Sequence, residues 1–196
     1  MIEIYEKYLE VINSYLDKFF EQQKSYIFCQ EGCSICCETG TYPLSKIEFD
    51  YIMMGYELLS DEVKEKIKKN IKNIIVAKNE LGQDKFLHAC PFLIDKKCSV
   101  YKYRALICRS YGLMSFYFNE NGEQRYKIPC CVDQGLNYSN VYDQESKIIS
   151  SKKWNESGIE VEPVSHNVDL TFLTNNEMSQ DLNLEFGELK EMINWF

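Results

Sequence analysis

The sequence predicts a mainly α-helical fold with a small β-hairpin. Two observations support the helices: apolar residues recur at three- and four-residue intervals within residues 5–20 and again within residues 45–81. A third supports the hairpin, because the runs 113–118 and 124–128 flank the turn-forming sequence 119–123.

The first segment is predicted to form a helix that buries one face. Its apolar side chains have the spacing of a single helical stripe, which is typical of a helix packed against a domain core. The stripe consists of Tyr5, Tyr8, Leu9, Ile12, Tyr15, Leu16, Phe19 and Phe20.

Two further helices begin at serines that can cap them. Ser45 and Glu48 have capping-box spacing, so a helix is expected to start there. Ser60 can cap a third helix that reaches Leu81 and stops at Gly82. We interpret the lysines of this third helix as a solvated surface balanced by acids: Lys64, Lys66, Lys68, Lys69 and Lys72.

The C-terminal part is predicted to be a separate extension. Residues 137–180 are polar and weakly patterned, which indicates irregular structure. The boundaries are therefore placed at 1–136 for the main domain and 137–196 for the extension. The extension is expected to end in an amphipathic helix carrying Leu182, Leu184, Phe186, Leu189, Met192, Ile193 and Phe196.

Length and charge exclude several classes of protein. A chain of 196 residues suits one domain, and no stretch approaches the roughly 18–20 apolar residues of a membrane helix. The N-terminus lacks the basic and apolar regions of a signal peptide, so a cytoplasmic protein is expected. The formal net charge of -8 argues against nonspecific binding to nucleic acid or to an anionic membrane.

The nine cysteines are the unusual feature of the composition. Thiols stay reduced in the cytosol, so clustered cysteines there indicate metal binding or catalysis. An odd number also fits a disulfide framework poorly. We therefore predict a single metal-centred domain.

Four of the cysteines lie within nine residues. On a helix, Cys29, Cys33, Cys36 and Cys37 would share one face, whereas in a tight loop Gly32 would let the backbone turn. Either geometry brings thiolates close together. Because such thiolates repel one another, the arrangement is favourable only around a cation or a cluster.

The later cysteines could complete the same site. Cys90 precedes Pro91, as some ferredoxin-type ligands do, and residues 95–97 could turn the chain back toward Cys98. His88 is a further ligand candidate, although packing is the ordinary role of such a histidine. The later cysteines are Cys90, Cys98, Cys108, Cys130 and Cys131. Composition alone adds the last two of them, Cys130 and Cys131.

Two blocks of sequence resemble the CxxCxxCC cysteine-cluster proteins, a YkgJ-like family described as zinc- or iron-chelating. The blocks cover roughly residues 28–111. Three residues separate the first two cysteines where the family usually has two, and Ala105 stands where the family usually has proline. The first block runs from Phe28 to Cys37. The second consists of Cys90-Pro91-Phe92-Leu93, Cys98-Ser99-Val100-Tyr101, Arg104 and Cys108-Arg109-Ser110-Tyr111.

The resemblance implies a ligand set and two cofactor-binding arginines. Arg104 and Arg109 would lie beside anionic thiolates and offset their charge, although each alone also fits a surface ion pair. The implied metal ligands are Cys29, Cys33, Cys36, Cys37, Cys90, Cys98 and Cys108, to which composition adds Cys130 and Cys131.

The leading function is metal binding, with zinc or an iron–sulfur cluster as the cofactor. Neighbouring side chains such as Cys36 and Cys37 seldom reach one tetrahedral ion, so a polynuclear or two-site arrangement is expected, with iron–sulfur favoured in anaerobic preparations and zinc in aerobic ones. We expect the first cysteine cluster and the later cysteines to share a site.

Two other functions stay open. The spacing from Cys29 to Cys36 is also that of radical S-adenosylmethionine enzymes, but the helices that follow do not suit their repeated barrel. Flagellin lysine methylases resemble the same family, so an iron–sulfur-dependent redox or protein-modifying enzyme is one alternative, although the chain lacks a GxGxxG nucleotide loop. The other is an interaction module with structural zinc and a protein partner.

Overall fold

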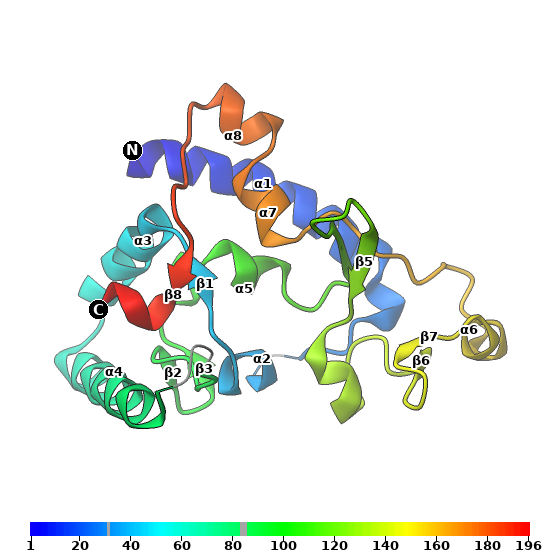
Figure 1. Cartoon of the computed structure of the whole chain (residues 1–196), viewed down its shortest axis with the longest axis horizontal. Coiled ribbons are helices and arrows are strands. Elements are labelled where there is room, and N and C mark those ends of the chain that lie inside the picture. Colours follow the sequence, from blue (N-terminus) through cyan, green and yellow to red (C-terminus); the bar gives the residue numbers. More distant parts are fainter. Residues whose placement is uncertain (31, 83–85) are drawn as a thin grey trace.

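Helices dominate the chain. The computed structural model describes residues 1–30, 32–82 and 86–196 (Figure 1). About 49% of the chain is helical and 12% lies in strands, which confirms a mainly α fold with small β elements. The α-helices are α1 (Ile2–Gln22), α2 (Ile35–Glu38), α3 (Lys46–Glu57), α4 (Asp61–Leu81), α5 (Leu106–Ser110), α6 (Ser151–Ser157), α7 (Leu170–Thr174) and α8 (Glu177–Asp181).

The strands form antiparallel pairs and short 3₁₀ turns connect several elements. The pairs are β1 (Pro43–Leu44) with β8 (Lys190–Glu191), β2 (Leu93–Ile94) with β3 (Lys97–Cys98), β4 (Ser115–Phe118) with β5 (Gln124–Lys127), and β6 (Tyr142–Asp143) with β7 (Ile148–Ile149). The 3₁₀ turns are η1 (Lys24–Tyr26), η2 (Tyr101–Tyr103), η3 (Cys130–Gln134) and η4 (Met192–Trp195).

The three predicted helices are confirmed. α1 buries five residues of its predicted stripe. α3 begins with the expected capping box of Ser45 and Glu48. The side chain of Ser60 accepts a hydrogen bond from the amide of Val63 at the start of α4, and Gly82 ends that helix in the left-handed conformation, with φ 56°.

The predicted hairpin is also confirmed. β4 and β5 pair in register, with Phe116 opposite Tyr126 and Tyr117 opposite Arg125. Gly122 has a φ of 76° in the connecting turn, a conformation that glycine adopts without steric cost. The hairpin projects beside the body formed by the helices (Figure 1).

The predicted C-terminal amphipathic helix is wrong. Residues 184–189 form neither helix nor strand, and the chain ends in β8 and η4. The apolar residues Leu182, Leu184 and Phe186 alternate, which suits an extended segment, and Gly187 adopts a φ of 68° that a helix does not contain. Pairing of β8 with β1 of the N-terminal half then fixes the segment across the molecule (Figure 1).

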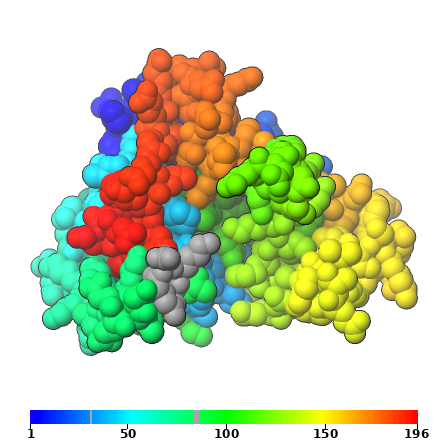
Figure 2. Space-filling view, in the orientation of Figure 1, coloured from blue at the N-terminus to red at the C-terminus, as the bar shows by residue number. Residues whose placement is uncertain are grey.

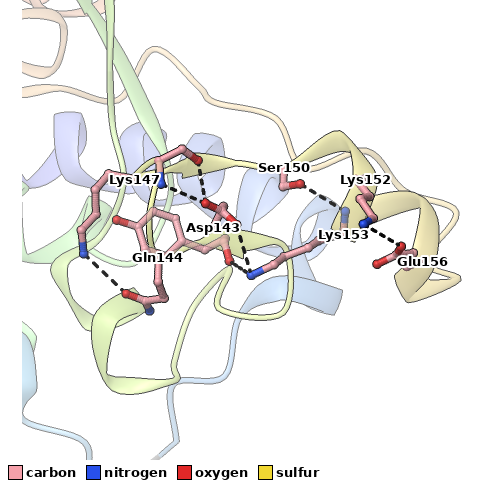
Figure 3. Close-up of polar contacts among 9 residues, drawn as sticks. Asp143, Gln144, Lys147, Ser150, Lys152, Lys153 and Glu156 are labelled. Carbon is pink, nitrogen blue, oxygen red and sulfur yellow. Dashed lines mark hydrogen bonds and ion pairs between the residues drawn. The ribbon is translucent and has the colours of Figure 1, made fainter.

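The prediction of irregular structure for residues 137–180 is wrong in part, because β6, β7, α6, α7 and α8 lie there. Polar contacts hold β6 to α6 (Figure 3). The ammonium group of Lys153 lies 3.7 Å from the carboxylate of Asp143 and donates to the carbonyl of Tyr142 at 2.7 Å. The Ser150 hydroxyl caps α6 by accepting from the amide of Lys153.

The core consists of three apolar clusters. The first joins α1 to α7 and to the extended C-terminal segment through Leu184 and Phe186. The second lies among α3, α4, α5 and η4 and contains Cys37, Cys90, Cys98 and Cys108. The third surrounds Tyr26, Met114 and Tyr138.

Within the described residues, no helix combines the length and apolar character that crossing a membrane requires.

Candidate metal centre

The first cysteine cluster is part loop and part helix. Cys29 and Cys33 precede α2, and Gly32 between them has a φ of 89°. Cys36 and Cys37 lie on α2, with their sulfurs 3.9 Å apart. The sequence left open whether this segment is a helix or a tight loop. Its first half is the loop and its second half is the helix. The loop directs one pair of thiols and the short helix directs the other.

Cys29, Cys33, Cys130 and Cys131 form what we call the outer thiol group. The neighbouring Cys131 thiol lowers the pKa of Cys29 to about 6 against the effect of burial, and Asn137 and Cys33 act in the same direction as Cys131. Cys131 is buried, whereas the other three are exposed. This group therefore joins segments about a hundred residues apart in the sequence.

A fully buried asparagine holds the outer thiol group in place. The Asn137 side-chain oxygen accepts hydrogen bonds from the amides of Phe28 (2.8 Å) and Cys29 (3.1 Å), and its nitrogen donates to the carbonyl of Gly112 (2.9 Å). A Cβ on Gly112 would lie 2.9 Å from that nitrogen, so only glycine fits against Asn137 without displacement. Asn137 was not among the residues singled out by the sequence, because nothing local marks it.

Cys37, Cys90, Cys98 and Cys108 form the inner thiol group, within the second apolar cluster. The amide of Cys90 donates to the carbonyl of Cys37 at 2.8 Å, which joins α2 to the segment that leads into the β2–β3 hairpin. Asp95 and Lys96 both have positive φ in the tight turn of that hairpin, and this turn returns the chain to Cys98 as expected.

Burial makes three of the inner thiols hard to ionise without a cation. It raises the pKa of Cys90 and Cys98, and it raises that of Cys108 to about 12, with added repulsion from neighbouring thiolates. A positive ion bound among them would reverse this effect, because thiolate is the form that ligates metal.

Cys36 lies between the two groups. Hydrogen bonding with Cys37 raises the pKa of Cys36, followed by burial and by the charges of Cys37 and Cys29. The charge of Cys36 in turn raises the pKa of all three later inner thiols. α2 also packs against η3, which carries Cys130 and Cys131, and Figure 1 shows α2 between the β2–β3 side and the β5–β7 side of the molecule.

The two arginines have different surroundings. The guanidinium of Arg104 stacks on the Tyr101 ring at 3.9 Å, and its charge lowers the pKa of Cys98 and Cys108 against the larger effect of burial. Arg109 is buried and donates to the carbonyls of Arg104 and Lys102 and to Asn13. Arg104 therefore contributes charge at the inner thiols, whereas Arg109 folds the 102–109 segment.

Three other polar residues lie near the thiols. The Tyr111 hydroxyl lies 2.7 Å from the Cys130 sulfur, a contact that spacing alone does not predict. His88 is buried, and its Nε2 has no partner among the residues described. The carboxylate of Glu48 accepts from the amide of Leu106 at 2.9 Å and so holds the start of α5, which bears Cys108.

The donor set fits a metal that prefers sulfur. All nine cysteines lie in the described part of the chain and carry free thiols. Across residues 1–30, 32–82 and 86–196, no three His, Cys, Asp or Glu side chains are already arranged to hold an ion. The thiols meet as pairs, and the side chain of cysteine can reorient by rotation about a single bond, χ1. Thiolate is a ligand type that suits both zinc and iron.

Comparison with known proteins agrees with the chemistry of this donor set. Residues 28–131, more than half of the chain, match the model of the CxxCxxCC family, whose description reads "Putative zinc- or iron-chelating domain". The matched region includes Cys130 and Cys131 and so extends beyond the two blocks that carry the resemblance. No curated protein and no solved structure matches the chain. The chain therefore belongs to the CxxCxxCC family.

Proposed function

We propose that the protein chelates zinc or iron through its cysteine thiolates, in two adjoining groups that meet at Cys36. The observation that carries the proposal is the convergence of three distant segments, 29–37, 90–108 and 130–131, on the short helix α2. Membership of the CxxCxxCC family supports it. The metal centre would then lie between the second and third apolar clusters.

Electrostatics supports a multiply charged cation at this position. The chain carries a net charge of -8, and neighbouring thiolates raise one another's pKa. The charge of Arg104 favours the thiolates of Cys98 and Cys108, and Arg109 also interacts favourably with that of Cys108, but each guanidinium offsets only a single charge. Nine free thiols need a reducing compartment to remain ligands, and for this reason we propose a cytoplasmic location.

Serine substitutions test the proposal and the division into groups. Serine keeps the size of cysteine and removes the soft ligand. Cys33→Ser and Cys98→Ser are each expected to remove only part of the bound metal, because they lie in different groups, whereas Cys36→Ser should weaken both. Metal analysis of the purified variants gives the stoichiometry.

Two other metal contents of these variants would change the proposal. If Cys33→Ser and Cys98→Ser each remove all the metal, a single shared site replaces the two groups. If all three variants keep the full metal content, the proposed function is wrong.

The identity of the metal is a separate question, on which we favour an iron–sulfur cluster in anaerobic preparations. Adjacent cysteines such as Cys36 and Cys37 serve a polynuclear centre more easily than one ion, and Cys90 precedes a proline as in some ferredoxin-type motifs. Purification from iron-replete anaerobic cells should give a brown protein with broad visible absorption. Zinc has no such absorption, so a colourless protein with stoichiometric zinc would reject the cluster.

That result would also bear on catalysis. An iron–sulfur centre keeps open the second candidate function, a redox or protein-modifying enzyme. A closed zinc site would favour a structural role for the metal.

A further inference from the structure

A cleft of about 420 Å³ opens beside the outer thiol group. It lies between the β4–β5 hairpin, α5 and the start of α7, and Figure 2 shows a recess between the green hairpin and the orange segment that contains α7. This volume is within the range of small-molecule sites. Ile107, Leu113 and Val168 give it an apolar side, whereas the hairpin gives it a polar side.

One strand face of the hairpin supplies the polar side. Successive side chains of a strand point to opposite faces, so Ser115 and Tyr117 of β4 share a face with Lys127 of β5, and all three line the cleft. Phe116, Phe118 and Tyr126 occupy the other face and lie outside the cleft. The alternation of the hairpin thus separates an aromatic surface from a set of hydrogen-bond donors.

Ser115 places a hydroxyl without a protein partner at the wall of the cleft. Its side chain lines the cleft, the residue is only 7% exposed, and its hydroxyl makes no hydrogen bond with any residue that the structure describes. The hydroxyl is open to the cleft and is not enclosed in the interior, so a bound ligand could replace water as its partner.

Lys127 gives the cleft a positive charge. It makes no ion pair with the described acids, in a chain whose net charge is -8. The one carboxylate at the cleft, Asp169, accepts hydrogen bonds from the amides of Thr171 and Phe172 and so caps α7. Its charge is directed to that helix start, which leaves the Lys127 ammonium available to a ligand.

We propose that this cleft binds a small monocarboxylate with an apolar body. Lys127 and the hydroxyl of Ser115 would bind the carboxylate, and Ile107, Leu113 and Val168 would contact the body. A single cation balances one negative charge, which favours a carboxylate over a phosphate dianion.

The cleft also borders the thiols. Tyr111 lines it, and the Tyr111 hydroxyl lies 2.7 Å from the Cys130 sulfur. A bound carboxylate would therefore lie next to the outer thiol group. Binding at the cleft does not itself require metal, so this proposal and the proposed function can fail separately.

Amide NMR of the labelled full-length protein tests the cleft. Phenylpropionate and octanoate serve as probes, with phenylpropionamide as the uncharged match and inorganic phosphate as the competing anion. Both carboxylates are expected to shift the amide signals of Ser115 and Lys127 and to leave those of α4 unchanged. The amide and phosphate should bind roughly tenfold more weakly or not at all.

Variants of the same hairpin provide the controls. Lys127→Gln should weaken carboxylate binding by about tenfold or more, and Ser115→Ala should weaken it by about threefold. Arg125→Gln removes an equal charge from the same strand, but Arg125 pairs with Glu123 and does not line the cleft, so affinity should not change.

Several results would overturn the proposal. They are no shift with either carboxylate, equal binding of the uncharged amide, tighter binding of phosphate, and an unchanged affinity in a folded Lys127→Gln variant. Metal analysis of the same samples shows whether the thiol site is loaded, so loss of metal is not mistaken for loss of the cleft.

Discussion

Removing the metal from the purified protein is expected to lower its melting temperature by on the order of 20 °C. The proposed ligands come from the loop before α2, from α2 itself, from the β2–β3 hairpin, from α5 and from η3. These elements are short, and a bound cation would link them all. Structural zinc in small motifs contributes on the order of 10 kcal/mol, which is comparable to the total stability of a domain.

The measurement is thermal unfolding before and after treatment with a chelator, with metal analysis at each step. The same chelator saturated with zinc beforehand is the control for direct effects of the reagent. Zinc or iron added back should restore the original curve. A melting curve that stays the same after verified removal of the metal would contradict a structural role.

Local signals in the sequence were sufficient to predict much of the fold. Ser45 and Glu48 mark the start of α3, Ser60 and Gly82 delimit α4, and the 119–123 turn defines the β4–β5 hairpin. Each of these signals depends on residues within a few positions of one another, so tertiary structure does not override it.

The C-terminal segment shows where such reasoning fails. Leu182, Phe186, Leu189 and Ile193 fall on one side of a helix, but residues 182–186 equally suit an extended chain that buries alternate residues. The choice depends on β1 and on the two apolar clusters that the segment joins. Those partners are more than a hundred residues away, and composition does not reveal them.

The metal site was likewise predictable from the sequence only in part. Clustering identified the cysteines as candidate ligands, yet it left open how they divide, because that depends on how α2 lies between η3 and the β2–β3 hairpin. Asn137 has no sequence signal of its own, and Tyr111 entered only as the last residue of the second family block. Their importance follows from contacts with Cys29 and Cys130 that only the folded chain makes.

Glu48 is expected to be the most sensitive polar residue outside the thiols. It is fully buried, and its carboxylate accepts from the amide and hydroxyl of Ser45 (2.8 Å each) and from the amide of Leu106 (2.9 Å). It therefore caps α3 and holds the start of α5 with one side chain. Glu48→Ala would leave buried donors without a partner and create a cavity, at a cost of about 3–5 kcal/mol.

Glu48→Gln separates the effects of shape and charge. A glutamine has one acceptor oxygen, so either Ser45 or Leu106 would face its NH₂ group, and a smaller loss of about 1–3 kcal/mol is expected. Urea unfolding measures both variants. Glu57→Gln is the matched control on the same helix, because its side chain is 69% exposed and pairs only with Lys64; it should change stability by less than about 0.5 kcal/mol.

The pH dependence gives an independent check on Glu48. Burial raises the pKa of Glu48 above its ordinary value, so the folded protein holds this proton more tightly than the unfolded chain. The resulting stability is fully present below the unfolded pKa and is lost as pH rises through the folded pKa. Glu48→Gln cannot ionise and should lose this part of the pH dependence, whereas Glu57→Gln should retain it. If the wild type and Glu48→Gln show the same change in unfolding free energy across that interval, Glu48 does not carry the raised pKa.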